Sequence, residues 1–109
     1  LAKEYFDINQ ESQHMLIATK VKRAKKNQIP ATVHIDDSCR VQTVHRKTNK
    51  KFFELIKQFY KITSIPVVLN TSFNIKGQPI VNSPEDAITC FLKYKIDYLA
   101  IGDFLVKKK

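Results

Sequence analysis

The sequence predicts an α/β (α+β) fold with a mixed twisted sheet and two main helices. Two stretches with a helical spacing of apolar residues, at 49–63 and from Ser83 onward, alternate with short stretches of β-branched residues. The resulting order is a strand, a hairpin, a helix, a strand, a helix and a closing strand or strand pair. This order is typical of helices packed on a sheet, and 109 residues suit one domain over residues 1–109.

The first half of the chain is expected to hold three strands. Residues 14–21 are apolar and then alternate, residues 31–35 are rich in β-branched side chains, and residues 39–44 alternate. The short polar side chains of residues 36–38 favour a turn. We therefore expect 31–35 and 39–44 to pair as a β-hairpin.

The first helix, expected over residues 49–63, has one apolar face and one lysine-rich face. Thr48 or Asn49 can cap its N-terminus, and Ser64 and Pro66 end it. A strand is expected to follow at 65–70. The apolar positions of the helix are Phe52, Leu55, Ile56, Phe59 and Tyr60, and the lysines are Lys50, Lys51, Lys57 and Lys61.

The second helix has a clear start signal. Ser83 is a good N-cap, Pro84 suits the first helical position, and Asp86 gives a capping-box-like arrangement. One or two short strands are expected afterwards, at 98–106, interrupted at Gly102 and Asp103. The apolar stripe of the helix consists of Ala87, Ile88, Phe91 and Leu92.

The charge balance favours anionic partners. Nineteen Lys and Arg residues stand against ten Asp and Glu, which gives a formal net charge of +9. Nucleotides, phosphates and nucleic acid are attracted by such a charge, although scattered lysines also occur on any solvated surface. The one dense cluster, KVKRAKK at 20–26, is either a ligand contact or an exposed loop.

Targeting signals are not apparent in the sequence. No apolar run reaches the roughly 18 residues of a membrane helix, and the first residues do not resemble a signal peptide. Cys39 and Cys90 are therefore expected to be reduced thiols of a cytoplasmic protein, with Cys90 packed in the core. Because the chain lacks an initiator Met, we expect a fragment of a longer protein.

The stretch LNTSFNIKGQPIV turns from apolar to polar where a strand should end. Asn amides and Ser or Thr hydroxyls at the carboxyl edge of a sheet can hold a phosphate or carbamoyl group. The alternative is that these side chains only satisfy their own backbone. Gly77 and Pro79 shape a tight turn, and the loop is not a Walker A sequence. The polar residues are Asn70, Thr71, Ser72 and Asn74.

The stretch HIDDSCRVQTV, residues 34–44, holds a second set of candidates. Arg40 is expected on a strand, where it either points to solvent or binds phosphate through two hydrogen bonds from its guanidinium group. His34 is either a site residue or a structural one. Neither a metal site nor a Cys39 nucleophile is expected, because the spacing of His and Cys residues matches no such motif.

Several motifs in their order along the chain carry a family resemblance: YFD, HMLIATKV, IPATVHIDDSCRVQTV, IPVVLNTSFNIKGQPIVNSPEDAI and YLAIGDFLV. They resemble the C-terminal region of the NodU/CmcH-type O-carbamoyltransferases, a family that includes nodulation, tobramycin and cephamycin carbamoyltransferases. The resemblance covers about residues 3–106. Asp37 is a departure, since the family pattern has Gly there.

The resemblance implies an enzyme with a Kae1-like N-terminal domain and a YrdC-like C-terminal domain, of which this chain would be a fragment. The YrdC-like domain would make carbamoyl adenylate from carbamoyl phosphate and ATP with Mg²⁺, and the Kae1-like domain would pass the carbamoyl group to an acceptor small molecule. Its basic Gly-Pro-Arg segment would lie upstream. We therefore expect the isolated chain to be catalytically inactive, and it could form a homodimer through exposed sheet edges.

Carried over by position, Arg40, Asn70, Ser72 and Asn74 would line the nucleotide and carbamoyl phosphate site. His34, Gln42 and Thr43 are further candidates from the first motif. No residue is assigned a catalytic role. The alternative functions are a small basic module that binds RNA or another nucleic acid, which the KVKRAKK cluster favours, and a pure interaction domain.

Overall fold

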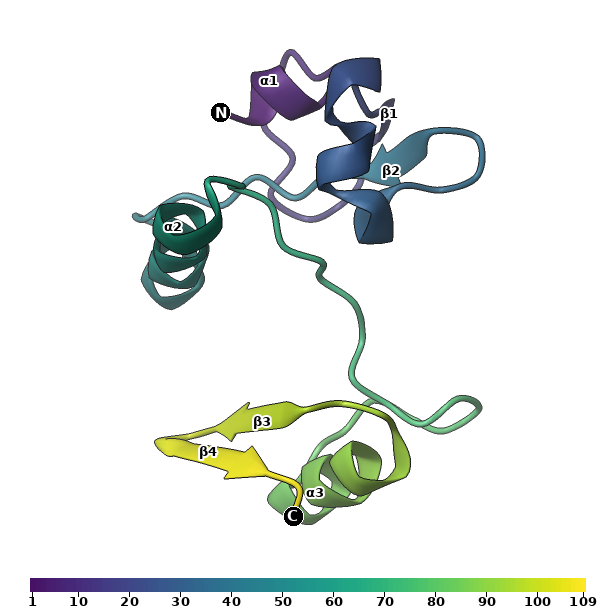
Figure 1. Ribbon diagram of the computed structural model, residues 1–109, viewed down its shortest axis with the longest axis vertical. Coiled ribbons are helices and arrows are strands. Elements are labelled where there is room, and N and C mark those ends of the chain that lie inside the picture. Colours follow the sequence, from purple (N-terminus) through teal and green to yellow (C-terminus); the bar gives the residue numbers. More distant parts are fainter. The chain divides into compact units, whose positions relative to one another are not determined.

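A computed structural model describes all residues from Leu1 to Lys109. The chain divides into two compact units, Leu1–Leu69 and Asn70–Lys109 (Figure 1), and each is described by itself. The α+β class is confirmed, with the strands in two separate antiparallel sheets of two strands each rather than in one mixed sheet. A single domain over residues 1–109 stays a prediction. None of the helices combines the length and apolar character of a membrane span.

The first unit is built around a short antiparallel ribbon. Strand β1 (Ala18–Lys20) pairs with β2 (Ser38–Arg40), so that Thr19 lies opposite Cys39. The core is a cluster of Tyr5, Phe6, Ile8, Val21, Ile29, Cys39 and Val41. The elements are α1 (Ala2–Tyr5), β1 (Ala18–Lys20), the 3₁₀ helices η1 (Arg23–Gln28) and η2 (Pro30–Thr32), β2 (Ser38–Arg40) and α2 (Lys50–Thr63).

The predicted hairpin of 31–35 with 39–44 is wrong, because β2 pairs with β1 instead. Pro30 opens η2, and the Thr32 hydroxyl donates to the Ile29 carbonyl at 2.9 Å, which keeps this segment helical. The His34 and Asp37 amides then close a tight loop by donating to Ser38 O and His34 O, each at 2.9 Å. The β-branched residues near 31–35 thus lie in a 3₁₀ turn and a loop.

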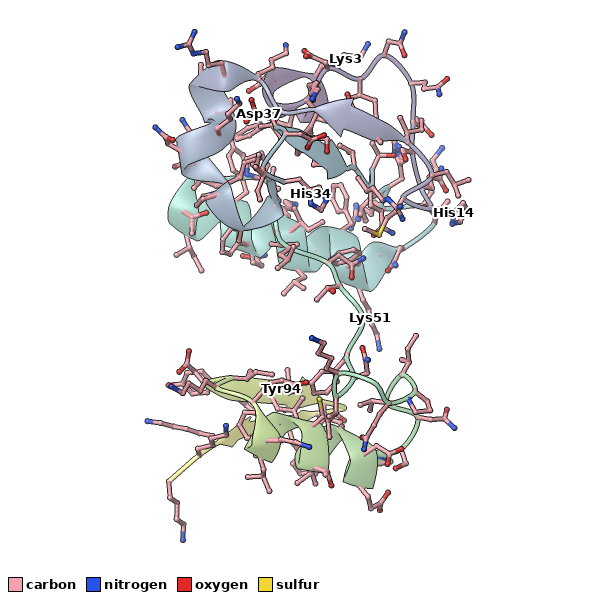
Figure 2. The ribbon with its side chains drawn as sticks, turned by 90° about the vertical axis from the view of Figure 1, so that its right-hand side faces the viewer. Lys3, His14, His34, Asp37, Lys51 and Tyr94 are labelled. Carbon is pink, nitrogen blue, oxygen red and sulfur yellow. The ribbon has the colours of Figure 1, made fainter.

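Asp37 adopts a left-handed conformation with φ 68°, which explains why glycine suits this position. Its carboxylate forms an ion pair with Lys26 on η1, and Asp37 lies close to that helix in Figure 2. The loop therefore keeps its shape with an aspartate, a residue that tolerates the left-handed region better than most.

Replacing Asp37 with Val should cost about 2 kcal/mol of unfolding free energy relative to Asp37→Gly, because a β-branched residue is strained at positive φ. Asp37→Gly itself should change the free energy of unfolding by no more than about 1 kcal/mol. Glycine relieves the backbone strain at positive φ, and this gain nearly cancels the loss of a partly exposed ion pair. Urea unfolding of the three proteins measures this. Equal stabilities of the Val and Gly variants would contradict the assigned conformation.

Helix α2 begins and ends as its sequence predicts. The Asn49 side chain accepts a hydrogen bond from the Phe52 amide at 3.2 Å, and Ser64 ends the helix with φ 60°. The predicted strand at 65–70 is wrong, because these residues form no regular secondary structure and belong to no sheet. Ile65 and Val67 pack against the core cluster, so the segment has a strand's alternation without a partner strand.

The second unit combines a helix with a β-hairpin. Its elements are α3 (Pro84–Lys93), β3 (Tyr98–Ile101) and β4 (Phe104–Lys107), and the hairpin packs beside α3 (Figure 1). The turn between the strands is confirmed at Gly102, which has φ 57°. The buried residues of α3 are Ala87, Cys90 and Phe91, which confirms the core position of Cys90.

The start of α3 follows the sequence prediction. The Ser83 hydroxyl accepts a hydrogen bond from the Asp86 amide at 3.1 Å, and Pro84 occupies the first turn. The Asp86 carboxylate accepts from the Asn82 amide at 3.4 Å rather than from Ser83, one residue away from an ideal capping box.

Candidate functional site

Arg40 stands at the end of β2 with its side chain exposed. Its register partner on β1 is Ala18, so no acidic residue faces it across the ribbon. The guanidinium group has no hydrogen bond or ion pair with any other residue, whereas Arg46 pairs with Glu54 at 3.2 Å. A free guanidinium group on a strand can accept a phosphate through two parallel hydrogen bonds.

Most of the KVKRAKK cluster is engaged within the chain. The Lys20 ammonium lies 3.9 Å from the Asp36 carboxylate, and Lys26 pairs with Asp37. The Lys25 ammonium lies 4.8 Å from the centre of the Tyr5 ring. Lys22 and Arg23 remain as exposed cations without a partner. The cluster therefore offers less free charge than its sequence suggests.

The loop before β2 is held by Asp36. Its carboxylate accepts hydrogen bonds from the Ser38 hydroxyl at 2.6 Å and from the Ser38 amide at 3.0 Å. These two bonds, with a smaller contribution from Lys20, lower the pKa of Asp36 below its ordinary value of 3.8. They favour the carboxylate form and so fix the loop that leads into Arg40.

Ser38→Ala should raise the pKa of Asp36 part of the way back toward its ordinary value, because one of the two hydrogen bonds is lost. Since the pKa is lower in the folded state, the stability from Asp36 is present above its unfolded pKa. That contribution disappears as the pH falls through the folded pKa. Carboxyl NMR titration of Asp36 measures the change, with Ser72→Ala as a control that should leave it unchanged. An unaltered titration in Ser38→Ala would contradict the assignment.

His34 serves the loop through its backbone. Its amide donates to Ser38 O and its carbonyl accepts from the Asp37 amide, both at 2.9 Å. The imidazole is exposed and makes no side-chain hydrogen bond or ion pair.

Thr43 connects the segment that follows β2 to the segment around Ser12 through hydrogen bonds. Its hydroxyl accepts from the Ser12 amide at 2.9 Å, and its own amide donates to the Ser12 carbonyl at 2.7 Å. The Gln42 side chain donates to the Gln13 carbonyl at 3.1 Å, while the Ser12 hydroxyl is buried without a partner. The hydrogen-bonding role of Thr43 is therefore structural.

A small pocket of about 200 Å³ lies between these segments and the N-terminal end of α2. His14 is one of its residues, and in Figure 2 it lies near the end of α2 that carries Lys51. From the sequence, Thr48 and Asn49 are predicted only as helix caps, and the structure also places them in the pocket lining. The lining residues are Gln13, His14, Gln42, Thr43, Val44, Thr48 and Asn49.

The polar loop of the second unit divides into two kinds of residue. The Asn74 amide donates to the carbonyls of Ile75 and Gln78, both at 3.2 Å, so it holds its own turn. Gly77 has φ 82° within that turn, as the third residue of a type II turn requires, and the tight turn is confirmed. Ser72, by contrast, is exposed and its hydroxyl has no partner. Asn70 is exposed as well, but it interacts with another residue.

The predicted site residues thus come from both units. Arg40, His34 and Thr43 belong to the first, and Asn70, Ser72 and Asn74 belong to the second. Arg40 and Ser72 present unpaired groups, whereas Thr43 and Asn74 use theirs within the fold.

No group of three or more His, Cys, Asp and Glu residues gathers where it could hold a metal ion. Cys39 is 3% exposed, and burial raises the pKa of its thiol. Since the thiolate is the reactive form, Cys39 is suited to packing rather than to nucleophilic attack.

Comparison with known proteins agrees with the motifs. The family described as "Carbamoyltransferase C-terminus" matches residues 1–108. The nodulation protein NolO of Bradyrhizobium diazoefficiens is 43% identical over 99% of this chain, which corresponds to 20% of that protein. An uncharacterized protein of Synechocystis is 37% identical over 96% of this chain and 20% of its own length. Nodulation protein U of Rhizobium tropici is 34% identical over 83% of this chain and 15% of its own length.

The chain therefore spans a fifth or less of the length of these relatives. The family match extends over almost every residue, including both motifs that carry Arg40 and Ser72. The resemblance to NodU-type proteins is confirmed. This chain belongs to the carbamoyltransferase C-terminus family.

Proposed function

We propose that this chain is the C-terminal part of an O-carbamoyltransferase and contributes to the site where carbamoyl phosphate and ATP form carbamoyl adenylate. The unpaired guanidinium group of Arg40 is the observation that carries this proposal. Within the fold, nearby cations such as Lys20 and Lys26 are neutralised by carboxylates, and Arg40 is left without one. A phosphate of the substrate would supply the missing anion.

Ser72 and Asn70 fit the same chemistry as neutral donors. A hydroxyl and a carboxamide can hydrogen-bond to phosphate or carbamoyl oxygens without adding charge. Asn74 would act as a positioning residue that keeps their loop in shape, and Thr43 and His34 would do the same for the loop and strand around Arg40.

The proposed reaction needs charge stabilisation more than a protein nucleophile. Water cleaves carbamoyl phosphate to carbamate and phosphate, and a carbamate oxygen then attacks the α-phosphorus of ATP as pyrophosphate leaves. Arg40 would stabilise the negative charge on the phosphate oxygens, and the donors would orient them. Mg²⁺, when bound, would offset phosphate charge.

The carbamoyl group would then pass to the hydroxyl of an acceptor small molecule in a further, Kae1-like N-terminal part of the protein. The test is ATP–pyrophosphate exchange by the full-length gene product without any acceptor. We expect exchange only when carbamoyl phosphate and Mg²⁺ are present. Exchange that is absent, or that does not depend on carbamoyl phosphate, would refute the proposed activation step.

The alternative of an RNA-binding module is weakened by the internal pairing of Lys20, Lys25 and Lys26. It predicts RNA binding that falls steeply with salt and does not respond to ATP. Such binding together with absent pyrophosphate exchange would favour this second function.

A further inference from the structure

We infer that Tyr94 is a positioning residue for the polar loop at 70–82, and that its hydroxyl group raises the affinity of the protein for carbamoyl phosphate by holding that loop in place. The inference deepens the proposed function and rests on it, because Tyr94 would act through Ser72, one of the proposed donors. Tyr94 lies between the last two motifs of the family resemblance and belongs to neither. Its role is therefore argued from the contacts of the folded chain.

The part of the loop from Phe73 to Val81 is bonded to itself. The Val81 amide donates to the Phe73 carbonyl at 2.9 Å, which joins the two arms of the loop. The Gln78 amide donates to the Ile75 carbonyl at 2.9 Å, which closes the turn at its tip. Since Ser72 directly precedes Phe73, the placement of this bonded stretch also decides where the Ser72 hydroxyl can reach.

Tyr94 attaches the tip of the loop to the end of α3. Its hydroxyl oxygen accepts a hydrogen bond from the Lys76 amide at 2.7 Å, and Lys76 is the second residue of the type II turn. No other hydrogen bond joins residues 73–80 to the rest of the second unit. Hydrogen bonding therefore holds the loop tip at a single point, which is the phenol oxygen of Tyr94.

The base of the loop is fixed at the opposite end of the same helix. The Asn82 amide donates to the Asp86 carboxylate at 3.4 Å, in the first turn of α3. Tyr94 is the residue that ends α3, whose 10 residues span about 15 Å. The two attachments hold the loop at both ends of one helix, and loss of the bond to Tyr94 would leave hydrogen bonds at its base alone.

Tyr94 is itself a firm support. Its amide donates to the carbonyl of the buried Cys90 at 3.2 Å. Its own carbonyl accepts from the Ile96 amide at 2.9 Å and from the Lys108 ammonium. The residue is 37% exposed, so most of its surface is packed. A group that is fixed in this way holds a binding loop more precisely than another loop residue could.

The size of the effect follows from the strength of one hydrogen bond. Such a bond changes the ratio of attached to detached loop about fivefold. Because the substrate would bind the attached form, its apparent affinity falls with the fraction of molecules in that form. Loss of the bond should therefore weaken substrate binding by a factor of up to about five. The chemical step takes place in the attached form and should keep its rate.

The test replaces Tyr94 with Phe in the full-length gene product and measures ATP–pyrophosphate exchange at varied carbamoyl phosphate. We expect KM for carbamoyl phosphate to rise about three- to fivefold, while kcat stays within about twofold of wild type. A residue that only stabilised the fold would instead lower the amount of active protein, and hence kcat, without changing KM. Lys76→Pro should reproduce the rise in KM, since proline suits the second position of a type II turn and lacks the donating amide.

Tyr98→Phe is the matched control, because it removes a hydroxyl group from the same unit. Tyr98 lies on β3 and is 52% exposed, and its hydroxyl makes no hydrogen bond. Both KM and kcat should stay as in wild type.

Amide hydrogen exchange of Lys76 tests the contact without reference to activity. We expect the Lys76 amide to exchange about fivefold faster in Tyr94→Phe than in wild type, and at the wild-type rate in Tyr98→Phe. An unchanged rate for Lys76, or equal KM values in the two tyrosine variants, would overturn this inference alone. If the wild-type protein shows no carbamoyl phosphate-dependent pyrophosphate exchange, the proposed function is refuted, and the role given to Tyr94 is refuted with it.

Discussion

Replacing Arg40 with Ala in the full-length gene product should lower kcat/KM for ATP in carbamoyl transfer by about 100-fold or more. The expected loss is large because the guanidinium group is the unpaired cation of the β1–β2 ribbon and would lie against phosphate charge. The melting temperature should hardly change, since Arg40 makes no ion pair or hydrogen bond through its side chain that the fold would lose. Steady-state kinetics with varied ATP and thermal unfolding measure the two effects.

Arg46→Ala is the matched control for this experiment. Arg46 is also an exposed arginine of the first unit, but it pairs with Glu54 at 3.2 Å. We expect its loss to leave kcat/KM within about threefold of wild type, because exposed ion pairs contribute little. Arg40→Lys should recover only part of the activity, since an ammonium group cannot bind a phosphate through two parallel bonds. Equal effects of Arg40→Ala and Arg46→Ala would refute the role given to Arg40.

The features that sequence predicts well here are local ones. Asn49 and Ser83 cap their helices through bonds to residues three positions on, and Gly102 turns between neighbouring strands. Each of these depends on side chains within a few residues of one another. The turn at Gly77 belongs to the same class, as does the Asn74 side chain that holds it.

The features that the sequence did not predict depend on distant partners. Residues 31–35 have the composition of a strand, but β2 pairs with β1, some twenty positions earlier, and the Pro30 turn holds the segment apart. Segment 65–69 has a strand's pattern, but it forms no strand and pairs with none. Propensity predicts that a stretch is extended, and pairing is decided by tertiary contacts.

The same distinction separates the candidate site residues. Arg40 and Lys26 look alike in the sequence as cations near strands, but only the folded chain shows that Asp37 neutralises Lys26. Thr43 looked like a ligand residue through its motif, and the structure shows its hydroxyl bonded to the Ser12 amide. Whether a polar group is free to bind a substrate is a three-dimensional property, because its competitors lie far away along the chain.

Phe91→Ala should be the most destabilising single change in the second unit. Phe91 is 1% exposed on α3, and the Lys108 ammonium lies 5.0 Å from the centre of its ring. Removing a fully buried Phe side chain costs about 3–5 kcal/mol through lost burial and the cavity left behind. A unit of this size has a small core and is marginally stable, so we expect Asn70–Lys109 to unfold in this variant. Amide exchange of α3, β3 and β4 measures the loss.

Leu92→Ala is the matched control, because Leu92 is the next residue of the same helix and is 64% exposed. Its replacement should change the unfolding free energy by no more than about 0.5 kcal/mol, as is usual for exposed positions. Since the two variants share the helix, the hydrophobic character and the change to Ala, the difference between them mainly reports burial. Similar losses in both would show that Leu92 is buried as well, and that the packing of α3 against β3 and β4 differs from the arrangement described above.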